Sequence, residues 1–191
     1  MLDLKGRKII LASASPRRKQ LLEGLDIPFE LRLRDCDESV PSTLDNEKVA
    51  IFLAKKKAAV YLTDIAANEI IITSDTTVLK DHLLLNKPKD KEDAKRMLTT
   101  LSGSSHTVIT GVCLSSKEKQ ICFDTRSVVK FKVLDNSEID YYIAHYKPFD
   151  KAGSYGIQEW LGYIAIEKIE GSYFNIMGFP VHRIYEELKA F

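Results

Sequence analysis

The chain has 191 residues, a formal net charge of +1 and 45% hydrophobic residues. This length is typical of one large domain, so we expect a single domain over residues 1–191 with a real hydrophobic core. The near-zero net charge excludes a global basic field that would attract nucleic acid or an anionic membrane, and we expect neither as a partner. Any anion must therefore be recognised by a local group of residues.

Cysteine use and hydropathy predict a cytoplasmic location. Cys36, Cys113 and Cys122 are odd in number and lack C-x-x-C spacing, so we expect ordinary thiols of a reducing compartment, with neither a disulfide framework nor a zinc site. The apolar run after the basic start at residues 1–8 is only four residues long, which is too short for a secretion signal. No run approaches the length of a membrane span.

The stretch Lys8–Leu22 indicates a strand, a polar turn and a helix. Ile9–Leu11 is a short apolar run, and Ser15 and Pro16 are typical of an N-cap and a first helical position. The next three residues, Arg17–Lys19, place cations where the helix dipole favours acidic side chains. The pattern fits either a solvated basic helix start or a site where backbone N–H groups and cations bind a phosphate.

A second helix is expected from Asp45 or Asn46 to about Tyr61, and it carries a run of three lysines. Lys56 and Lys57 both have apolar neighbours at helical spacing. At least one of the two amines must therefore lie along an apolar surface, where it either extends to solvent or reaches a buried anion. The spacing alone does not decide between these alternatives.

Residues 69–78 predict a strand that is buried on both faces, because three isoleucines follow one another at Ile70–Ile72. We expect the strand to end in Ser74, Asp75 and Thr76. A carboxylate would then lie at the mouth of an open α/β sheet, where such sheets bind ligands. The alternative is that Asp75 caps a turn.

Turn residues and hydrophobic periodicity predict the remaining elements. These are a strand over 27–33, an acidic loop over 34–39, a hairpin turned at 80–82, a helix from Asp90 to Gly103, strands over 106–114 and 120–134, a helix from Asn136 or Ser137, a glycine-containing loop over 148–158, a strand over 163–169 and a helix over 181–188. The mixture predicts an α/β fold with a mixed, curved sheet, flanking helices and a cleft between two lobes.

The polar features match the needs of polyphosphate chemistry. Cations and backbone N–H groups hold phosphates, and carboxylates hold a hard divalent cation through oxygen ligands. A carboxylate can also orient or deprotonate a water molecule. The four histidines show no paired spacing and the chain has no G-x-S-x-G motif, which argues against a zinc hydrolase and a serine nucleophile.

Five motifs in the same order resemble those of the Maf family of nucleoside triphosphate pyrophosphatases. They are Ser13–Arg18, Ser74–Thr76, Asn86–Pro88, Leu101–Gly103 and Asp150–Gln158. The resemblance covers about residues 9–188. It implies an ITPase-like (Maf/Ham1) fold, often dimeric, and hydrolysis between the α and β phosphates to give the nucleoside monophosphate and pyrophosphate. It also implies a divalent metal cation, Mg or Mn.

The resemblance assigns roles to individual residues. Asp75 matches the family's proton acceptor, and Glu38 matches an acidic residue near the metal and the water, so Glu38 and Asp75 are expected to hold the metal. Lys57, rather than its neighbours, matches the family's helix lysine. The expected substrate-binding residues are Ser13, Arg17, Arg18, Lys57, Thr76, Lys87 and Gln158.

Within the family, Arg17, Thr76 and Gln158 match the subgroup that acts on dTTP and UTP. The subgroup that acts on 7-methyl-GTP tends to carry an aromatic residue, Gln and a Lys-Ser-Glu stretch at these places. A physical reason exists for Gln158, because a carboxamide offers a donor and an acceptor to the N3–H and a carbonyl of uracil or thymine. The chain departs from the family at Glu159 and Trp160, where glycine is common. A bulky residue there can reshape the base pocket, although Trp160 can also simply pack in the core.

The resulting hypothesis is a house-cleaning dTTP/UTP pyrophosphatase that also accepts modified pyrimidine nucleotides. The alternative is a nucleotide-binding regulator of cell division, acting in septum formation without significant turnover. The set Glu38, Lys57, Asp75 and Lys87 favours the enzyme, because a pure binding protein has no need of a poised carboxylate. A third reading, a purine-directed pyrophosphatase of the same fold, disagrees with the subgroup residues.

Overall fold

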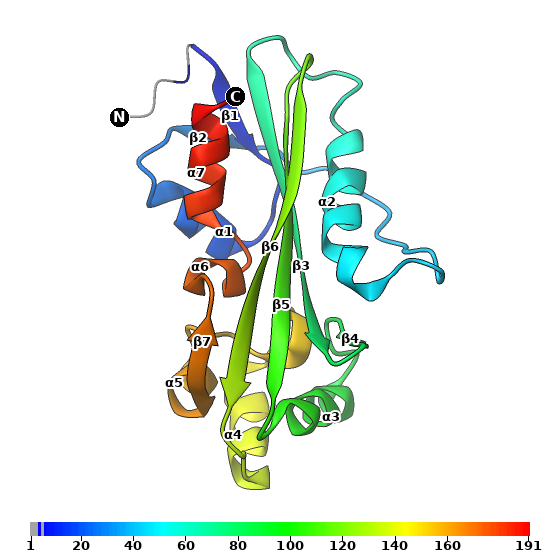
Figure 1. Ribbon diagram of the computed structural model, residues 1–191, viewed down its shortest axis with the longest axis vertical. Helices are drawn as coiled ribbons and strands as arrows, with labels where there is room; N and C mark the ends of the chain where they lie inside the picture. Colours follow the sequence, from blue (N-terminus) through cyan, green and yellow to red (C-terminus); the bar gives the residue numbers. More distant parts are fainter. Residues whose placement is uncertain (1–3, 5) are drawn as a thin grey trace. The chain divides into compact units, whose positions relative to one another are not determined.

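The computed structural model describes residue 4 and residues 6–191 (Figure 1). Part of the basic start considered above therefore lies outside the described residues. The chain divides into two compact units. The first unit comprises Met1–Asp75, Thr110–Thr125 and Gly178–Phe191, and the second unit comprises Thr76–Ile109 and Arg126–Met177. This division into units does not test the single domain expected over residues 1–191, which stays a prediction.

Seven strands of the described chain form one sheet in the order β2-β1-β3-β5-β6-β7, with β4 paired to β3. They are β1 (Lys8–Leu11), β2 (Phe29–Leu31), β3 (Glu69–Lys80), β4 (Leu83–Leu85), β5 (Ser105–Ser115), β6 (Gln120–Phe131) and β7 (Ile166–Glu170). Strand β1 is parallel to β2 and β3, whereas the β3–β4 and β6–β7 pairs are antiparallel. The predicted mixed α/β sheet is confirmed.

The helices begin close to the predicted caps. They are α1 (Pro16–Glu23), α2 (Val49–Ala59), α3 (Lys91–Leu101), α4 (Asn136–Tyr146), α5 (Trp160–Ala165), α6 (Tyr173–Ile176) and α7 (Val181–Lys189), with 3-10 turns η1 (Asn46–Lys48) and η2 (Ala152–Ser154). Ser15 accepts the N–H of Arg18 at the start of α1, and Asp90 caps α3. The N-cap of α4 is Asp135, one residue before the predicted position.

Side chains of β1 and β3 alternate between two apolar layers of the first unit. Ile9 and Leu11 pack with α1 and α7, whereas Ile10 between them points to the opposite face and contacts Tyr61. Ile71 of β3 lies on the same face as Ile10. Figure 1 shows α1 and α7 on one side of these strands and α2 on the other. The prediction that β3 is buried on both faces is therefore confirmed, and β1 is buried in the same way.

The predicted end of β3 is wrong, because the strand continues through Thr76 to Lys80. Pairing changes along its length. The parallel partner β1 ends with Leu11 opposite Ile72, and β4 then pairs with the end of β3 in antiparallel fashion from Val78 to Lys80. Asp75 lies between these two paired stretches, three residues beyond the last residue paired with β1. It is therefore inside a long strand and does not cap a turn.

The strand predicted over 163–169 is wrong in its first half, where α5 continues to Ala165 before β7 begins. Packing explains the difference. Leu161 and Ala165 are buried at helical spacing, and a Cβ added at Gly162 would lie 1.9 Å from the carbonyl oxygen of Ile157. Close packing therefore outweighs the β propensity of this segment. The short helix α6 was also not predicted, and β2 spans only part of the strand expected over 27–33.

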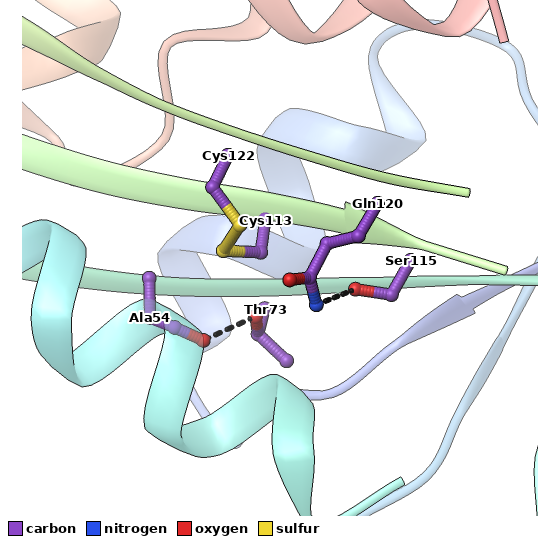
Figure 2. Close-up of a disulfide and its surroundings, with 6 residues drawn as sticks. All are labelled: Ala54, Thr73, Cys113, Ser115, Gln120 and Cys122. Carbon is purple, nitrogen blue, oxygen red and sulfur yellow. Dashed lines mark hydrogen bonds between the residues drawn. A yellow bond between two sulfur atoms is a disulfide. The ribbon is translucent and has the colours of Figure 1, made fainter. Parts of the chain in front are cut away.

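The expectation of unpaired thiols is wrong for Cys113 and Cys122, which form a disulfide between β5 and β6 (Figure 2). The two strands are joined by the turn 116–119. At the turn, the side-chain amide of Gln120 donates to the hydroxyl of Ser115 at 2.9 Å. The two cysteines lie two residues further along each strand, with their Cα atoms 4.2 Å apart, so that they face each other directly.

The disulfide packs against α2. Cys113 is fully buried and forms an apolar cluster with Ala54 and Ala58, which Cys122 joins from the partly buried side. The carbonyl of Ala54 accepts a hydrogen bond from the hydroxyl of Thr73 in β3 at 2.8 Å (Figure 2). Because two of the three cysteines are paired, the argument for a cytoplasmic location that rested on unpaired thiols no longer holds. In the part of the chain that the structure describes, no helix combines the length and hydropathy needed to cross a membrane.

We expect reduction of the disulfide to lower the free energy of unfolding by about 2–3 kcal/mol, because the bond closes a short loop in the unfolded chain. This corresponds to a decrease in Tm of about 5–10 °C for a chain of this size. Thermal unfolding with and without a thiol reductant measures the effect. The double variant Cys113→Ala/Cys122→Ala should be insensitive to the reductant, and Cys36→Ser, which changes the free cysteine, should keep the full response.

Candidate active site

Hydroxyl groups organise the turn between β1 and α1. Ser13 is buried, and its Oγ accepts the backbone N–H of Ser15 at 3.2 Å and the Nη1–H of Arg18 at 3.3 Å. Ser15 in turn caps α1. The turn therefore places fixed hydroxyl and guanidinium groups at the N-terminus of α1, where the helix dipole is positive. Such an arrangement can bind an anion.

Arg18 is held by backbone carbonyls. Its Nη1 donates to the carbonyl of Ser74 at 2.8 Å, and its Nε donates to the carbonyl of Gly178 at 3.0 Å. The hydroxyl of Ser74 donates to the same Gly178 carbonyl at 3.3 Å. We did not predict that Ser74 and Gly178 would hold the Arg18 guanidinium. The Gly178-Phe179-Pro180 motif before α7 was the available signal, since a glycine beside a buried aromatic residue often marks a close backbone approach.

Burial and neighbouring charges act on the guanidinium in opposite directions. Burial lowers the pKa of Arg18, the carboxylates of Asp75 and Glu38 raise it, and the adjacent Arg17 lowers it. A guanidinium remains protonated despite such a shift. The three cations at the start of α1 are therefore not all solvated, because the Arg18 guanidinium is buried in the site.

A lysine and two carboxylates meet beside the turn between β1 and α1. The Lys57 Nζ lies 2.6 Å from Oδ1 of Asp75 and 2.9 Å from Oε1 of Glu38. The Lys57 and Asp75 side chains are only 17% and 15% exposed, whereas that of Glu38 is 51% exposed. The ammonium therefore compensates a mostly buried carboxylate and fixes the acidic loop beside β3.

The neighbouring lysine has different partners. The Lys56 Nζ contacts Oδ2 of Asp37 at 2.7 Å and the carbonyl of Ser39 at 3.0 Å. The Lys56 ammonium and the Ser39 hydroxyl and N–H lower the pKa of Asp37. Lys57 is therefore the lysine that reaches a largely buried carboxylate, that of Asp75 in β3. Lys56 instead holds the acidic loop at the surface.

The carboxylates fit a divalent cation of the magnesium type. Among the described residues, no group of three or more His, Cys, Asp or Glu side chains could by itself hold a metal ion. Asp75 and Glu38 nevertheless converge on one cationic nitrogen, and two carboxylates together with substrate phosphates form a common donor set for Mg²⁺. The absence of a closed protein cage is therefore compatible with a hard cation that arrives with a polyphosphate.

Three of the predicted substrate-binding residues belong to the second unit. Thr76 follows Asp75 in β3 and is half-buried, and Lys87 is exposed beside the buried Pro88. Gln158 is half-buried, but its Oε1 atom is buried and has no hydrogen-bond partner in the described structure. A buried acceptor of this kind is costly to leave unpaired, by about 1–3 kcal/mol, which favours a ligand that donates to it.

The loop that carries Gln158 packs against the end of β3 and the segment before Lys87. The N–H of Gly153 donates to the carbonyl of Asn86 at 3.2 Å. Gly153 has a φ of 68°, and a Cβ added there would lie 3.1 Å from the methyl groups of Val78. Glycine is therefore favoured by the backbone conformation, and a Cβ there would also require Val78 to move by a few tenths of an ångström.

Tyr155 anchors the same loop in the apolar interior of the second unit. Its hydroxyl lies 2.8 Å from Nε2 of His106, and the two rings and that of Phe131 contact one another edge to face. Burial and the charge of Lys80 lower the pKa of His106 to about 3. The imidazole is therefore neutral at physiological pH and acts in packing and hydrogen bonding.

Comparisons with known proteins identify the family. The family model described as "Maf-like protein" matches residues 8–191. A Porphyromonas gingivalis protein named "dTTP/UTP pyrophosphatase" is 53% identical over 195 aligned positions, which cover 100% of this chain and 98% of that protein. A Bacteroides fragilis protein of the same name is 50% identical over 188 positions, covering 98% and 97%.

A solved structure supports the fold alone. The Ham1 protein of Staphylococcus aureus is similar with a TM-score of 0.52 and 12% identity, over 96% of this chain and 99% of that chain. The predicted Maf/Ham1 type of fold is therefore confirmed.

We expect the stability of the protein to decrease as the pH falls from about 6.5 towards 3, in part because of His106. The folded state keeps this imidazole neutral, whereas the unfolded chain binds a proton below pH 6.5. The contribution is up to about 1.4 kcal/mol for each pH unit. Urea unfolding at several pH values should show a smaller pH slope for His106→Gln. The exposed His182→Gln serves as the control, and equal slopes in both variants would contradict the expectation.

Proposed function

The chain belongs to the Maf family, and from this membership we propose that it hydrolyses dTTP and UTP between the α and β phosphates. The products are the nucleoside monophosphate and pyrophosphate. The names of relatives that share about half of their residues with this chain over nearly its whole length support the substrates. The observation that carries the proposal is the contact of Lys57 with both Asp75 and Glu38, beside the anion-binding start of α1.

Asp75 is proposed to accept the proton of the attacking water. Lys57 holds Oδ1 of this carboxylate, which fixes its orientation and leaves the second oxygen to face a water molecule. Lys57 also offsets the negative charge that the substrate brings. A carboxylate held in this way can orient and deprotonate water without forming a covalent intermediate.

The phosphates are proposed to bind at the start of α1. Ser13, Arg17 and Arg18 provide a hydroxyl and two guanidinium groups, and the helix N-terminus provides the positive end of its dipole. Lys57 and Lys87 are proposed as further phosphate ligands. In this arrangement cations and the helix dipole act together, so a chain with a net charge of only +1 can bind a polyanion.

Glu38 and Asp75 would hold a divalent cation, Mg²⁺ or Mn²⁺. When bound, the cation supplies charge neutralisation on the polyphosphate. The exposed position of Glu38 is consistent with a ligand that is shared between protein, water and substrate.

Gln158 is proposed to recognise the base. Its buried, unpartnered Oε1 can accept the N3–H that uracil and thymine share and that cytosine lacks. A site built around such a hydrogen bond rejects an analogue without the donor, because the acceptor then remains unpaired. Arg17 and Thr76 complete the subgroup pattern. A cytoplasmic location and a homodimer remain predictions, as do the lack of nucleic-acid and membrane partners.

We expect Asp75→Asn to keep the fold and to lower turnover on dTTP about 100-fold or more, as is typical for loss of a general base. Pyrophosphate release from dTTP, UTP, CTP, GTP and 7-methyl-GTP, with Mg²⁺, Mn²⁺ or a chelator, measures both turnover and selectivity. Asp140→Asn, in an exposed ion pair with Lys95, is the control and should retain activity.

The same panel tests the proposed function. Metal-dependent release from dTTP and UTP alone supports it, whereas release from 7-methyl-GTP would place the chain in the other subgroup. Nucleotide binding without release from any substrate would favour the regulator of cell division. An unchanged rate in folded Asp75→Asn would remove Asp75 from the proton-transfer step.

We expect Gln158→Ala to reduce the preference for dTTP over CTP about tenfold, since one base-specific hydrogen bond is lost. The ratio of kcat/KM values on the two nucleotides is the measurement. Gln120→Ala, which removes an exposed carboxamide and its bond to Ser115, is the control. An equal loss on every nucleotide would instead mean that Gln158 maintains the loop.

A further inference from the structure

The carboxylate of Glu159 joins α4 to both ends of the loop 150–158. Its Oε1 lies 3.0 Å from the Nζ of Lys151, and its Oε2 accepts a hydrogen bond from the hydroxyl of Tyr142. The same hydroxyl accepts the backbone N–H of Gly156 at 3.0 Å. This chain of contacts lies within the second unit, and we refer to Lys151, Glu159, Tyr142 and Gly156 as the loop clamp.

Of the two carboxylates that contact the Lys151 ammonium, that of Glu159 is the more buried and is therefore its main partner. The side chain of Lys151 is 9% exposed, and that of Glu159 is 22% exposed. Lys151 also contacts Asp150 at 2.7 Å, but the Asp150 side chain is 61% exposed and so is well solvated. Removing the charge of Glu159 would leave a buried ammonium with a mostly hydrated partner, which is unfavourable.

Tyr142 donates to Glu159 from a fully buried position. Burial, and then the hydrogen bond and the negative charge of Glu159, raise the pKa of Tyr142, so its hydroxyl remains protonated. The phenol therefore acts as a permanent donor to the carboxylate and as an acceptor for the loop backbone. A change at Tyr142 thus affects the same contacts as a change at Glu159.

Gly156 fits closely against the carboxylate. A Cβ added at Gly156 would lie 2.7 Å from the carboxyl carbon of Glu159, and the N–H of Glu159 donates to the Gly156 carbonyl at 3.1 Å. The loop clamp thereby fixes the backbone on both sides of Gln158. Trp160, the other residue that departs from the family pattern, packs against Tyr141 with ring centroids 4.8 Å apart.

We propose that Glu159 is a positioning residue that orients the carboxamide of Gln158 for the base. The inference rests on the proposed function in that Gln158 reads the base. Glu159 lowers the entropy that Gln158 would lose on binding, because the loop is ordered before the nucleotide arrives. Selectivity for dTTP and UTP therefore depends on a residue that does not itself touch the substrate.

The experiment compares Glu159→Gln, which keeps the shape and removes the charge, with Tyr142→Phe, which removes the shared hydroxyl. We expect each to raise KM for dTTP about tenfold while kcat stays within about twofold, and to lower the preference for dTTP over CTP by a similar factor. Glu167→Gln, in an exposed ion pair with Lys130, is the matched control and should change neither. Thermal unfolding identifies any variant that fails to fold.

Two readouts separate the loop clamp from the proposed function. Hydrogen–deuterium exchange of peptides covering 150–158 needs no substrate, and we expect it to become about tenfold faster in Glu159→Gln. Unchanged exchange would overturn the loop clamp, whereas absence of pyrophosphate release by the unsubstituted protein would overturn the proposed function.

A double variant tests whether Glu159 acts through Gln158. In a Gln158→Ala background, Glu159→Gln should have little further effect on the dTTP/CTP preference, because the carboxamide that it orients is gone. A full additional loss of preference in the double variant would show that Glu159 acts by another route. A fall in kcat without a rise in KM would equally overturn the positioning role.

Discussion

The parallel pairing of β1 with β3 is the constraint on which the first-unit site depends. The last pair joins Leu11 to Ile72, and the next N–H, that of Ala12, donates to the Ile72 carbonyl at 2.9 Å. Beyond this point β1 turns away while β3 continues. Ser13 and Asp75 therefore follow the last paired residues of two neighbouring strands, by two and three positions respectively. A slip of one residue would move each side chain into the opposite apolar layer, where the packing is built for different side chains, so this register is costly to shift.

Charge compensation then assembles the chemistry on that frame. Asp75 is mostly buried, and Lys57 satisfies it while also holding Glu38 from the acidic loop. Arg18 adds a second cation, which backbone carbonyl groups hold in place. Each cation thus has a structural partner in the protein and also contributes positive charge next to the anion-binding helix start. A site of this kind is ordered before a polyphosphate binds.

The second unit follows the same principle with a loop in place of strands. Gly153 packs against Val78, Tyr155 is held by His106, and Glu159 ties the last part of the loop to α4. A glycine-containing segment that would otherwise be variable is thereby fixed at three places. The buried Oε1 of Gln158 has no hydrogen-bond partner in the described structure, and a base that donates an N–H could satisfy it.

The sequence by itself determined the element types of most segments, the caps at Ser15 and Asp90, and the motifs that identify the family. These depend on local propensity and on hydrophobic period, which are readable along the chain. Helical spacing left open which lysine reaches an anion, because both amines have apolar neighbours; the family resemblance favoured Lys57, and the tertiary structure shows its contact with Asp75. Only the tertiary structure decided the Cys113–Cys122 disulfide, which required strand register, and the contacts of Glu159, which join segments brought together by packing. Such pairings depend on the positions of elements distant in sequence, and residue spacing does not encode those positions.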